Sequence, residues 1–387
     1  MPLRVLLAKE KYPERWESDI KEMESHEMKR KDTDVWRVEQ VNVVEFLHKV
    51  CKLQDRFSQE LIHFVCGVLE INAFAAHNRY GFEMRCLYPR TALLSHSCVP
   101  NVRHSIFMKS DSNDDYQIYV RAATKLDKGQ ELLLSYTHTL APTLFRRAHL
   151  REGKFFDCSC PRCADPTELG TNLSSLKCSK CDNGWVVSSS PLDENAHWQC
   201  THCEFVTKGE SVMRVFRIIQ KEIDELDYSE NQDPIAIREA FIKKYRSVLH
   251  PSHALILTVK YSLTQLYGRA VGYLFDDLPD IILERKIDLC RQLLKVADVI
   301  KPGYSRQRGW NLYELHAPII IFSRNLFSYK EIDEKGLRIR LEEAAKYLEE
   351  SATILAMEDP QSAEGVTAKI AFESLNELKN SINSLPK

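Results

Sequence analysis

Cysteines are the residues of this chain whose type and spacing most clearly suggest chemistry. The 387-residue sequence contains twelve of them, and two C-x2-C pairs stand eighteen residues apart: Cys178 with Cys181, and Cys200 with Cys203. Zinc takes four soft ligands in a tetrahedron, and each short turn of this kind supplies two thiolates. We therefore predict a structural zinc site, with Trp185 and Trp198 as its apolar platform, and unliganded thiols are the alternative.

A second group of thiols follows the pattern C-x-C-x2-C and comprises Cys158, Cys160 and Cys163. Three thiolates are one ligand short of a structural zinc site. The sequence leaves three candidates open for the fourth position: Cys98, His149 and Asp157. Three cysteines this close together indicate metal binding more than plain buried thiols.

The overall composition is that of a globular protein and excludes several other classes. Hydrophobic residues make up 44% and charged residues 28%, which rules out collagen-like, low-complexity and largely disordered chains. Lys and Arg number 53 against 55 Asp and Glu, so the formal charge of -2 gives no indication of a nucleic-acid partner. Apolar runs fall far short of a membrane span of ~20 residues, and no signal-peptide pattern opens the chain. We expect a soluble protein of the cytoplasm and/or nucleus, where clustered cysteines favour metal over disulfides.

The first part of the chain must position these cysteines through helices and short strands. Residues 1–70 are predicted to be helical, with helices over 13–31 and 38–51 and a third that begins after the N-cap Ser58. Short β-rich runs are predicted at 102–108, 116–122 and 131–136. Between them lie a loop or hairpin tip at 111–115 and a turn at Lys128-Gly129.

The last part of the chain, from residue 210, returns to helix. Its first helix carries an apolar stripe of Val212, Val215, Phe216, Ile219, Ile223 and Leu226. Further helices are predicted near 234–249, 252–268, 279–300, 305–327 and 336–357, with Pro251, Pro279, Pro302 and Pro360 between them. They resemble antiparallel helix pairs of the tetratricopeptide kind, although the sequence shows no clean repeat.

Several motifs carry a family resemblance. Residues 95–101 (SHSCVPN) resemble the N-H-x-C-x-P-N signature of SET-domain methyltransferases, and residues 129–136 (GQELLLSY) resemble the G-x-E signature that ends in a tyrosine. Residues 156–163 resemble the post-SET cysteine motif. Ile71–Phe74 and Leu87–Pro89 are similar to segments of the SET-and-MYND (SMYD-type) subfamily, and residues 136–140, 146–150 and 156–170 are similar to its arthropod-specific msta-like branch.

The resemblance implies an α+β fold. Small SET-type sheets with a pseudoknot would be followed by a zinc-bound post-SET segment, a zinc-ribbon insert and an all-α, TPR-like C-terminal domain. The expected boundaries are a helical SET-insert region at 1–68, the SET core at 69–138, the post-SET segment at 139–165, the zinc ribbon at 166–209 and the helical domain at 210–387.

The resemblance also implies cofactors and site residues. Asn72, Ser95, His96 and Phe156 fall where the family contacts S-adenosylmethionine. Tyr136 falls on the catalytic tyrosine, and Phe74 falls on the wall of the lysine channel. Cys98 becomes the fourth zinc ligand beside Cys158, Cys160 and Cys163. Alone, Tyr136, Phe74 and Tyr88 would be ordinary core aromatics.

The chemistry fits these residue types. Methyl transfer from a sulfonium to a neutral lysine is an in-line displacement that depends on alignment and exclusion of water. A tyrosine with a reference pKa of about 10 can orient the amine without acting as a strong base. Aromatic walls favour cationic groups through cation–π contacts.

Three departures from the family pattern stand beside the resemblance. No Gly-x-Gly turn or Cys/His cluster occurs upstream of residue 70, so we expect an N-terminally truncated SET protein that lacks the MYND zinc module. Ser95 replaces the first asparagine of the signature, and a lost hydrogen bond to a charged group can cost ~1.5–3 kcal/mol. Lys154 stands where relatives often have an aromatic residue, and its cation would repel a substrate lysine unless it points to solvent.

These features lead to competing functions. The first is a protein-lysine N-methyltransferase that uses S-adenosylmethionine on a histone or non-histone protein. The second is a catalytically inactive SET-family scaffold that binds a protein partner through its helical domain. A zinc-ribbon nucleic-acid binder is the third, and the near-neutral charge argues against it. In keeping with that, we expect five basic residues to form solvated faces: Lys125, Lys128, Arg146, Arg147 and Arg151.

Overall fold

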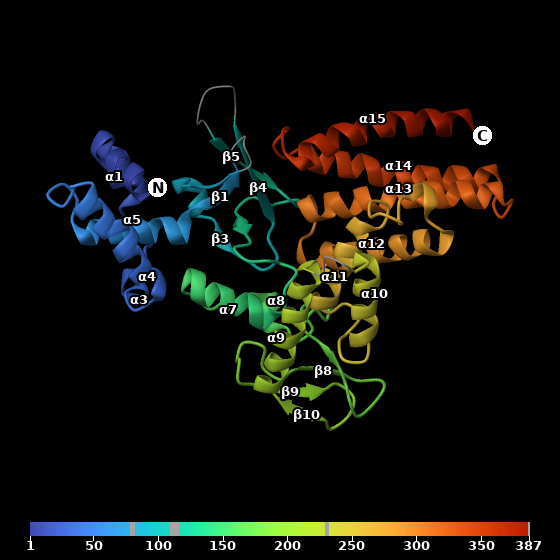
Figure 1. The fold of residues 1–387 in the computed structure, drawn as a ribbon, viewed down its shortest axis with the longest axis horizontal. Helices are drawn as coiled ribbons and strands as arrows, with labels where there is room; N and C mark the ends of the chain where they lie inside the picture. Colours follow the sequence, from blue (N-terminus) through green and yellow to red (C-terminus); the bar gives the residue numbers. More distant parts are fainter. Residues whose placement is uncertain (78–81, 109–115, 229–231, 386–387) are drawn as a thin grey trace. The chain divides into compact units, whose positions relative to one another are not determined.

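The computed structural model describes residues 1–77, 82–108, 116–228 and 232–385 (Figure 1). The chain divides into two compact units. The first unit comprises residues 1–96, 106–120 and 148–157, and the second comprises 97–105, 121–147 and 158–387.

Helices build the N-terminal part of the first unit. They are α1 (Pro2–Lys11), α2 (Pro13–Arg15), the π-helical segment η1 (Trp16–Ile20), α3 (Glu27–Arg30), α4 (Asp34–Glu39), the π-helical segment η2 (Gln40–Val50) and α5 (Gln59–Asn72). Ser58 caps α5 as predicted, because its side chain accepts a hydrogen bond from the Leu61 N–H at 3.2 Å. The helices enclose one core, formed by Leu6, Trp16, Val44, Leu47, Phe57, Ile62, Val65, Cys66 and Leu69.

The predicted helix over 13–31 is wrong in its length. Helical structure from residue 13 ends at Ile20, and α3 begins only after His26, whose φ of 50° is left-handed. The intervening chain turns back onto α5, where a Cβ on Gly67 would lie 2.5 Å from the Ser25 carbonyl oxygen. This close approach requires glycine at position 67, and such a tertiary contact overrides the local helical preference.

Short strands follow in the middle of the chain. β1 (Phe74–His77) pairs antiparallel with β2 (Glu83–Cys86), and α6 (Pro89–Ala92) follows. β4 (Val102–Met108) pairs with β5 (Tyr116–Ala122), and both match their predicted ranges. The remaining strands are β3 (Ser95–His96) and β6 (Leu133–Leu134). The predicted hairpin tip at 111–115 lies outside the described residues, and the turn at Gly129, with a φ of 88°, is confirmed.

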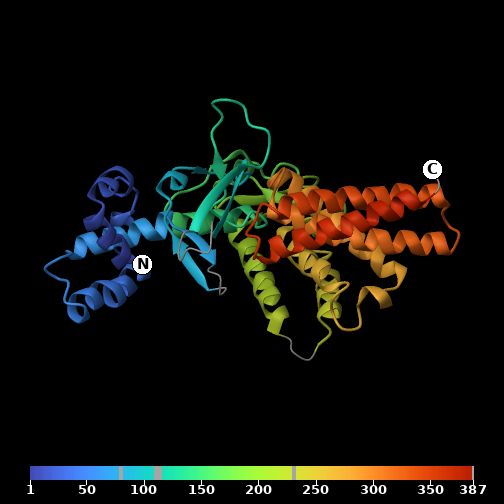
Figure 2. The same cartoon turned by 90° about the horizontal axis from the view of Figure 1, so that it is seen from above.

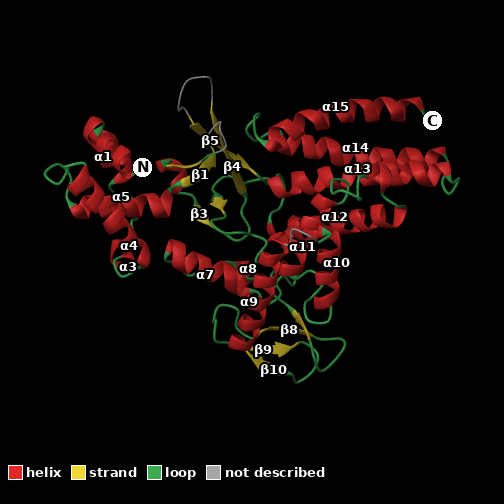
Figure 3. Ribbon diagram, in the orientation of Figure 1, coloured by secondary structure: helices red, strands yellow, loops and turns green. Residues whose placement is uncertain are grey.

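The cysteine-rich region of the second unit follows helix α7 (Thr143–Lys154), which contributes residues to both units. Helix α8 (Pro161–Ala164) is one short turn. The four-stranded antiparallel sheet has the order β10-β9-β8-β7, from β7 (Leu176–Lys177), β8 (Trp185–Ser188), β9 (His197–Cys200) and β10 (Val206–Lys208). The sheet lies beside helix α9 (Gly209–Glu225), where Trp198 packs edge-on against Phe216 (Figure 3).

Helices form the rest of the second unit. They are the short η3 (Leu226–Tyr228), α10 (Pro234–Tyr245), α11 (Ala254–Leu266), the short η4 (Phe275–Asp277), α12 (Asp280–Ile300), α13 (Arg306–Ser328), α14 (Glu334–Leu355) and α15 (Ala363–Ser384). Consecutive helices from α11 to α15 pack against one another, and α13, α14 and α15 lie alongside each other (Figure 1 and Figure 2). The predicted helices are therefore confirmed, and α15 is an addition. Within the described ranges, no helix is long and apolar enough to cross a membrane.

From the buried His253 in this helical region, we predict that the folding stability of the protein depends on pH. It is fully buried and caps α11 through Nδ1, which accepts from the Leu255 N–H at 3.2 Å. Burial lowers the pKa of His253 to about 3, whereas an unfolded histidine titrates near 6.5. Below pH 6.5 the unfolded state therefore binds a proton that the folded state does not, and stability falls as the pH falls.

We expect this histidine to cost the wild-type chain about 2 kcal/mol of unfolding free energy between pH 6.5 and pH 5. The variant His253→Asn retains a capping acceptor but no titrating group, so its dependence on pH should be flatter by that amount. Urea unfolding at pH 7 and pH 5 measures the difference, with His149→Asn, a change at an exposed histidine, as the control. An equal loss in wild type and His253→Asn contradicts the prediction.

Candidate functional site

The two sequence motifs that resemble SET signatures meet in the second unit. The Ser97 N–H donates to the Leu134 carbonyl oxygen at 2.8 Å, and the Asn101 N–H donates to that of Leu133 at 3.1 Å. The Asn101 carboxamide donates to the Glu131 carbonyl oxygen and accepts from the Leu133 N–H, both at 2.8 Å. Because the side chain takes these backbone partners, the predicted strand over 131–136 shortens to two residues.

Tyr136 lies two residues beyond β6 and is partly buried. Burial raises the pKa of its phenol above the usual 10. The hydroxyl therefore stays protonated at neutral pH, and its oxygen can accept a hydrogen bond from an N–H group. Tyr136 belongs to the second unit, together with all eight cysteines of the two predicted metal sites.

The predicted cofactor residues all lie in the first unit. His96 and Phe156 are brought together, with ring centroids 5.8 Å apart and planes tilted by 59°. Ser95 precedes His96 in β3 and is exposed. Asn72 ends α5, and its Nδ2 donates to the carbonyl oxygens of Val68 and Glu24, both at 2.9 Å.

The predicted channel residue Phe74 begins β1, two residues after Asn72. Its ring meets the edge of Tyr88 at a centroid distance of 6.0 Å. The Tyr88 hydroxyl in turn donates to the Tyr116 carbonyl oxygen at 2.8 Å, which fixes the orientation of that ring. Two aromatic rings therefore lie beside the end of α5.

Lys154 neither points to solvent nor stands unpartnered. Its ammonium donates to the carbonyl oxygens of Ile71 at 2.6 Å and Glu70 at 3.3 Å, at the C-terminal end of α5. Burial lowers the pKa of Lys154, while a cation at this end of a helix interacts favourably with its last carbonyls. Lys154 therefore serves as a cap for α5.

The first cysteine cluster can hold a zinc ion. The sulfurs of Cys98, Cys158, Cys160 and Cys163 all lie within 4.8 Å of one another. Cys98 Sγ is 3.5 Å from Cys163 Sγ and 4.0 Å from Cys158 Sγ. Zinc–sulfur bonds of about 2.3 Å in a tetrahedron set sulfur–sulfur distances of roughly 3.8 Å, so this arrangement fits the ion. Cys98 thus joins the triplet, whereas His149 and Asp157 are exposed.

The sulfurs of the second cluster lie at similar distances from one another. Cys178, Cys181, Cys200 and Cys203 also lie within 4.8 Å of one another, with Cys178 Sγ 3.6 Å from Cys203 Sγ and Cys181 Sγ 3.7 Å from Cys200 Sγ. Cys178 accepts from the Lys180 N–H, and Cys200 accepts from the N–H groups of His202 and Cys203. A Cβ on Gly184 would lie 2.1 Å from Cys200 Sγ, so this close approach requires glycine.

A buried charge cluster adjoins the first set of sulfurs. Arg146, Arg162 and Glu168 are each at most 1% exposed. Glu168 accepts from Arg146 at 2.6 Å and from Arg162 Nε at 3.0 Å. Although burial alone would raise the pKa of Glu168, the two guanidinium groups lower it to about 2. The carboxylate is therefore ionised at neutral pH.

This cluster contradicts one prediction, and it adds Arg162 and Glu168, which the sequence did not indicate. Arg146 and Arg147 were predicted to lie on solvated faces, but both are buried, at 0% and 7% exposure. Lys125 and Lys128 are exposed as predicted, and Arg151 is partly exposed and pairs with Asp157 at 2.8 Å. The available signal was the position of Arg146 on the apolar face of α7, four residues before Leu150, which is also buried.

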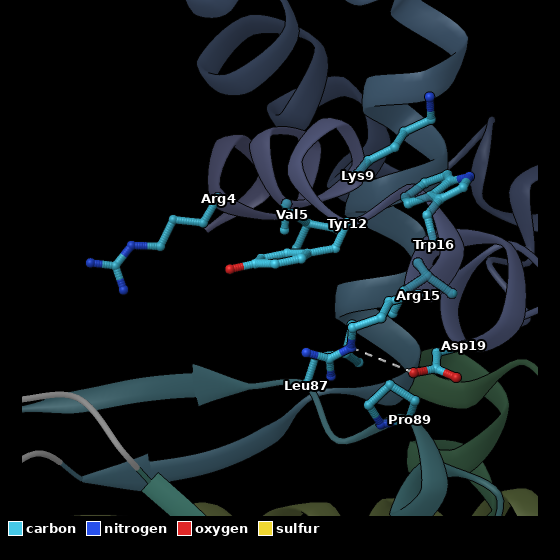
Figure 4. A pocket seen from close by; sticks show the side chains of 11 residues that line it. Arg4, Val5, Lys9, Tyr12, Arg15, Trp16, Asp19, Leu87 and Pro89 are labelled. Carbon is cyan, nitrogen blue, oxygen red and sulfur yellow. Dashed lines mark ion pairs between the residues drawn. The ribbon is translucent and has the colours of Figure 1, made fainter.

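A cavity of about 210 Å³ lies elsewhere in the first unit (Figure 4). Figure 4 shows Tyr12 on one side of it and Leu87 and Pro89 on the other, with Arg15 directed to Asp19 at 3.8 Å. Among the described residues, its lining includes none of the site residues predicted from the sequence. The complete lining is Arg4, Val5, Ala8, Lys9, Tyr12, Arg15, Trp16, Asp19, Ile20, Leu87 and Pro89.

Comparison with known proteins identifies the region that contains the signatures. Residues 5–137 match the SET domain family. The SET domain-containing protein SmydA-8, isoform A, of Drosophila melanogaster is 36% identical over 157 residues, which cover 39% of this chain and 32% of that protein.

Two vertebrate proteins are also similar. The histone-lysine N-methyltransferase Smyd1 of Mus musculus is 30% identical over 132 residues, covering 32% of this chain and 27% of that protein. The N-lysine methyltransferase SMYD2 of Gallus gallus is 29% identical over 164 residues, covering 41% of this chain and 36% of that protein. The matched region thus spans about a third of the length of these relatives.

Proposed function

Because the chain contains a SET domain and is homologous to SET-and-MYND proteins, we propose that it is a protein-lysine N-methyltransferase that uses S-adenosylmethionine. The observation that carries this proposal is the junction at Asn101. Its carboxamide joins residues 97–101 to residues 131–134 and so fixes the backbone that leads to Tyr136. The same hydrogen bonds favour the pseudoknot expected of this fold.

The proposed roles follow from the side chains. The cofactor supplies the methyl group as a sulfonium when it is bound. His96 and Phe156 offer an aromatic pair that suits a flat base or a cation, and Asn72 and Ser95 offer polar groups. Phe74 forms a channel wall that excludes water from the substrate lysine. The Tyr136 hydroxyl oxygen accepts a hydrogen bond from an amine N–H, which leaves the single lone pair of the amine free and directs it for in-line attack.

The two cysteine clusters would each hold one structural zinc ion. Cys98 links the ion to the SET segment, while the triplet at 158–163 supplies the other three thiolates. Four protein ligands leave no open coordination position, so the role is structural. The ion would hold the chain that follows Phe156 and thereby support the cofactor residue.

We further propose a lysine-bearing protein, histone or non-histone, as substrate, and a protein partner for the TPR-like helical domain. The names of the mouse and chicken relatives, histone-lysine and N-lysine methyltransferase, support the substrate class. The similarity to a Drosophila protein supports placement near the arthropod msta-like branch.

Transfer of a radioactive methyl group tests the function directly. The purified chain is incubated with [methyl-³H]S-adenosylmethionine and either core histones or an insect-cell protein extract, and the labelled products are hydrolysed and separated. We expect the label in methyl-lysine. Cofactor binding without label in any protein would contradict catalysis and favour the scaffold.

The serine in the first signature predicts a weakened cofactor site that one substitution improves. Ser95→Asn restores a carboxamide that both donates and accepts, where the hydroxyl is shorter. We expect it to tighten S-adenosylmethionine binding by roughly 10–150-fold, the equivalent of ~1.5–3 kcal/mol. Isothermal titration calorimetry measures the change, with Ser190→Asn, at an exposed serine of the ribbon, as the control. Unchanged or weaker binding by Ser95→Asn shows that position 95 does not contact the cofactor.

The scaffold remains the second candidate, and Ser95 is the observation that favours it. A second argument for the scaffold was the expected repulsion between Lys154 and a substrate lysine. The structure weakens this argument, because the Lys154 ammonium donates to the last carbonyl oxygens of α5. A chain that binds no S-adenosylmethionine, even with Ser95→Asn, would be a scaffold.

A further inference from the structure

Arg146 contacts the first cysteine cluster directly. Its Nε donates to Cys98 Sγ at 3.3 Å, and its Nη2 lies 3.5 Å from Cys163 Sγ. On its other edge, Nη1 donates to Glu168 at 2.6 Å. One planar guanidinium therefore bridges two sulfur ligands and a buried carboxylate, which a fork of five donors allows.

Burial makes the charge of Arg146 important. Four thiolates around a divalent zinc leave a charge of -2 at this site. The arginine side chain is 0% exposed, so bulk water screens its attraction to the sulfurs only weakly. Arg162 adds a second buried cation, which donates to the Cys98 carbonyl oxygen at 3.3 Å and also binds Glu168.

Within the described part of the chain, no arginine donates to the ribbon sulfurs, so this cluster provides a comparison within the same chain. Its thiols accept hydrogen bonds from the backbone N–H groups of Lys180, His202 and Cys203. The ribbon cysteines are all partly exposed, whereas Cys98, Cys158 and Cys163 are buried. The two sites share one ligand set and differ in their surroundings.

We propose that Arg146 is a positioning residue that retains zinc at the Cys98 cluster by donating hydrogen bonds to two of its thiolates, so that the ribbon releases zinc first. Donation to the sulfurs withdraws charge that protons or a competing chelator would otherwise attack. Outer-shell partners of this kind typically change metal affinity 10–100-fold. The inference rests on the two proposed zinc sites, and it holds with or without methyltransferase activity.

Zinc release from the full chain tests the proposal. The zinc content is measured first, and two ions per chain establish the sites on which the inference rests. Excess 4-(2-pyridylazo)resorcinol is then added and its zinc complex is followed by absorbance. Wild type should release one zinc quickly and one slowly. Cys203→Ser should remove the fast phase and thereby assign it to the ribbon.

Arg146→Gln should accelerate the slow phase roughly 10–100-fold and leave the fast phase unchanged. Arg146→Lys keeps the charge, but one ammonium cannot bind both sulfurs and Glu168. The rate of its slow phase should therefore fall between the rates of wild type and Arg146→Gln. Arg238→Gln is the matched control, because Arg238 is 6% exposed and donates to Ser262 at 2.8 Å and to the Pro234 carbonyl oxygen at 2.9 Å. Its two phases should match wild type.

A spectroscopic readout separates hydrogen bonding to sulfur from general stability. In the cobalt-substituted chain, loss of N–H donation to thiolates should shift the sulfur-to-metal charge-transfer bands to lower energy in Arg146→Gln but not in Arg238→Gln. An unchanged slow phase, or equal acceleration of both phases, overturns the proposal. If Arg146→Gln does not fold, the release rate and cobalt spectrum of Arg146→Lys decide the matter in the same way.

Discussion

Replacing Tyr136 by phenylalanine is expected to reduce methyl transfer roughly 100-fold or more, while cofactor binding and the fold remain intact. The substitution removes only a hydroxyl, and that hydroxyl is protonated because burial raises the pKa of Tyr136. A lysine amine whose N–H no longer donates to the tyrosine oxygen spends little time with its lone pair in line with the methyl group. The radioactive transfer assay measures the rate, and calorimetry measures cofactor affinity.

The matched control is Tyr347→Phe. Tyr347 is also partly buried, and its hydroxyl donates to Glu343 at 3.0 Å on α14, within the helical domain. This variant should transfer methyl groups at the wild-type rate. Equal rates for wild type and Tyr136→Phe would remove Tyr136 from catalysis, and a loss of affinity with an unchanged maximal rate would assign it to cofactor binding instead.

Cys98→Ser is expected to lower the zinc content from two ions per chain to one and to destabilise the second unit by more than about 4 kcal/mol. Serine is a poor ligand for zinc, and the substitution removes one of the two sulfurs to which the buried Arg146 donates. Structural zinc in small domains contributes an apparent 10–16 kcal/mol, so even partial loss is large. Elemental analysis and urea unfolding measure the two effects.

Cys290→Ser is the control for this substitution. Cys290 is 0% exposed, like Cys98, but it lies on α12 in the core formed by α12 to α15. Burial raises its pKa to about 12, so it stays a neutral thiol. We expect its zinc content to remain at two, with only a packing and polarity penalty. A zinc content of two in Cys98→Ser would show that another residue completes the first site.

Local features of the sequence were sufficient for most of the secondary structure. The ranges predicted for β4 and β5 match the observed strands, and the prolines at 251, 279, 302 and 360 all fall between helices. The stripe that begins at Val212 faces the core of the second unit. These predictions succeed because periodicity, capping and the missing N–H of proline act over a few residues.

Other features depended on contacts between distant residues and could not be predicted locally. The helix expected over 13–31 breaks because the chain must approach Gly67, and the strand expected over 131–136 shortens because Asn101 takes its backbone partners. Arg146 looked like a surface residue, yet Glu168 and two cysteines make its burial tolerable. A buried charge is stable only with such partners, which lie far away in the sequence.

The two candidate metal sites show most clearly which features follow from local sequence and which depend on distant contacts. The sequence by itself determined the four candidate ligands of the ribbon, because two C-x2-C turns supply all four thiols within twenty-six residues, Cys178 to Cys203. For the other cluster it determined only three candidate ligands and left Cys98, His149 and Asp157 open. The tertiary structure brings the sulfur of Cys98 to within 3.5 Å of Cys163 across sixty-four intervening residues. Only the packing of the whole unit closes a loop of that length, since no local interaction compensates for the entropy that its closure costs.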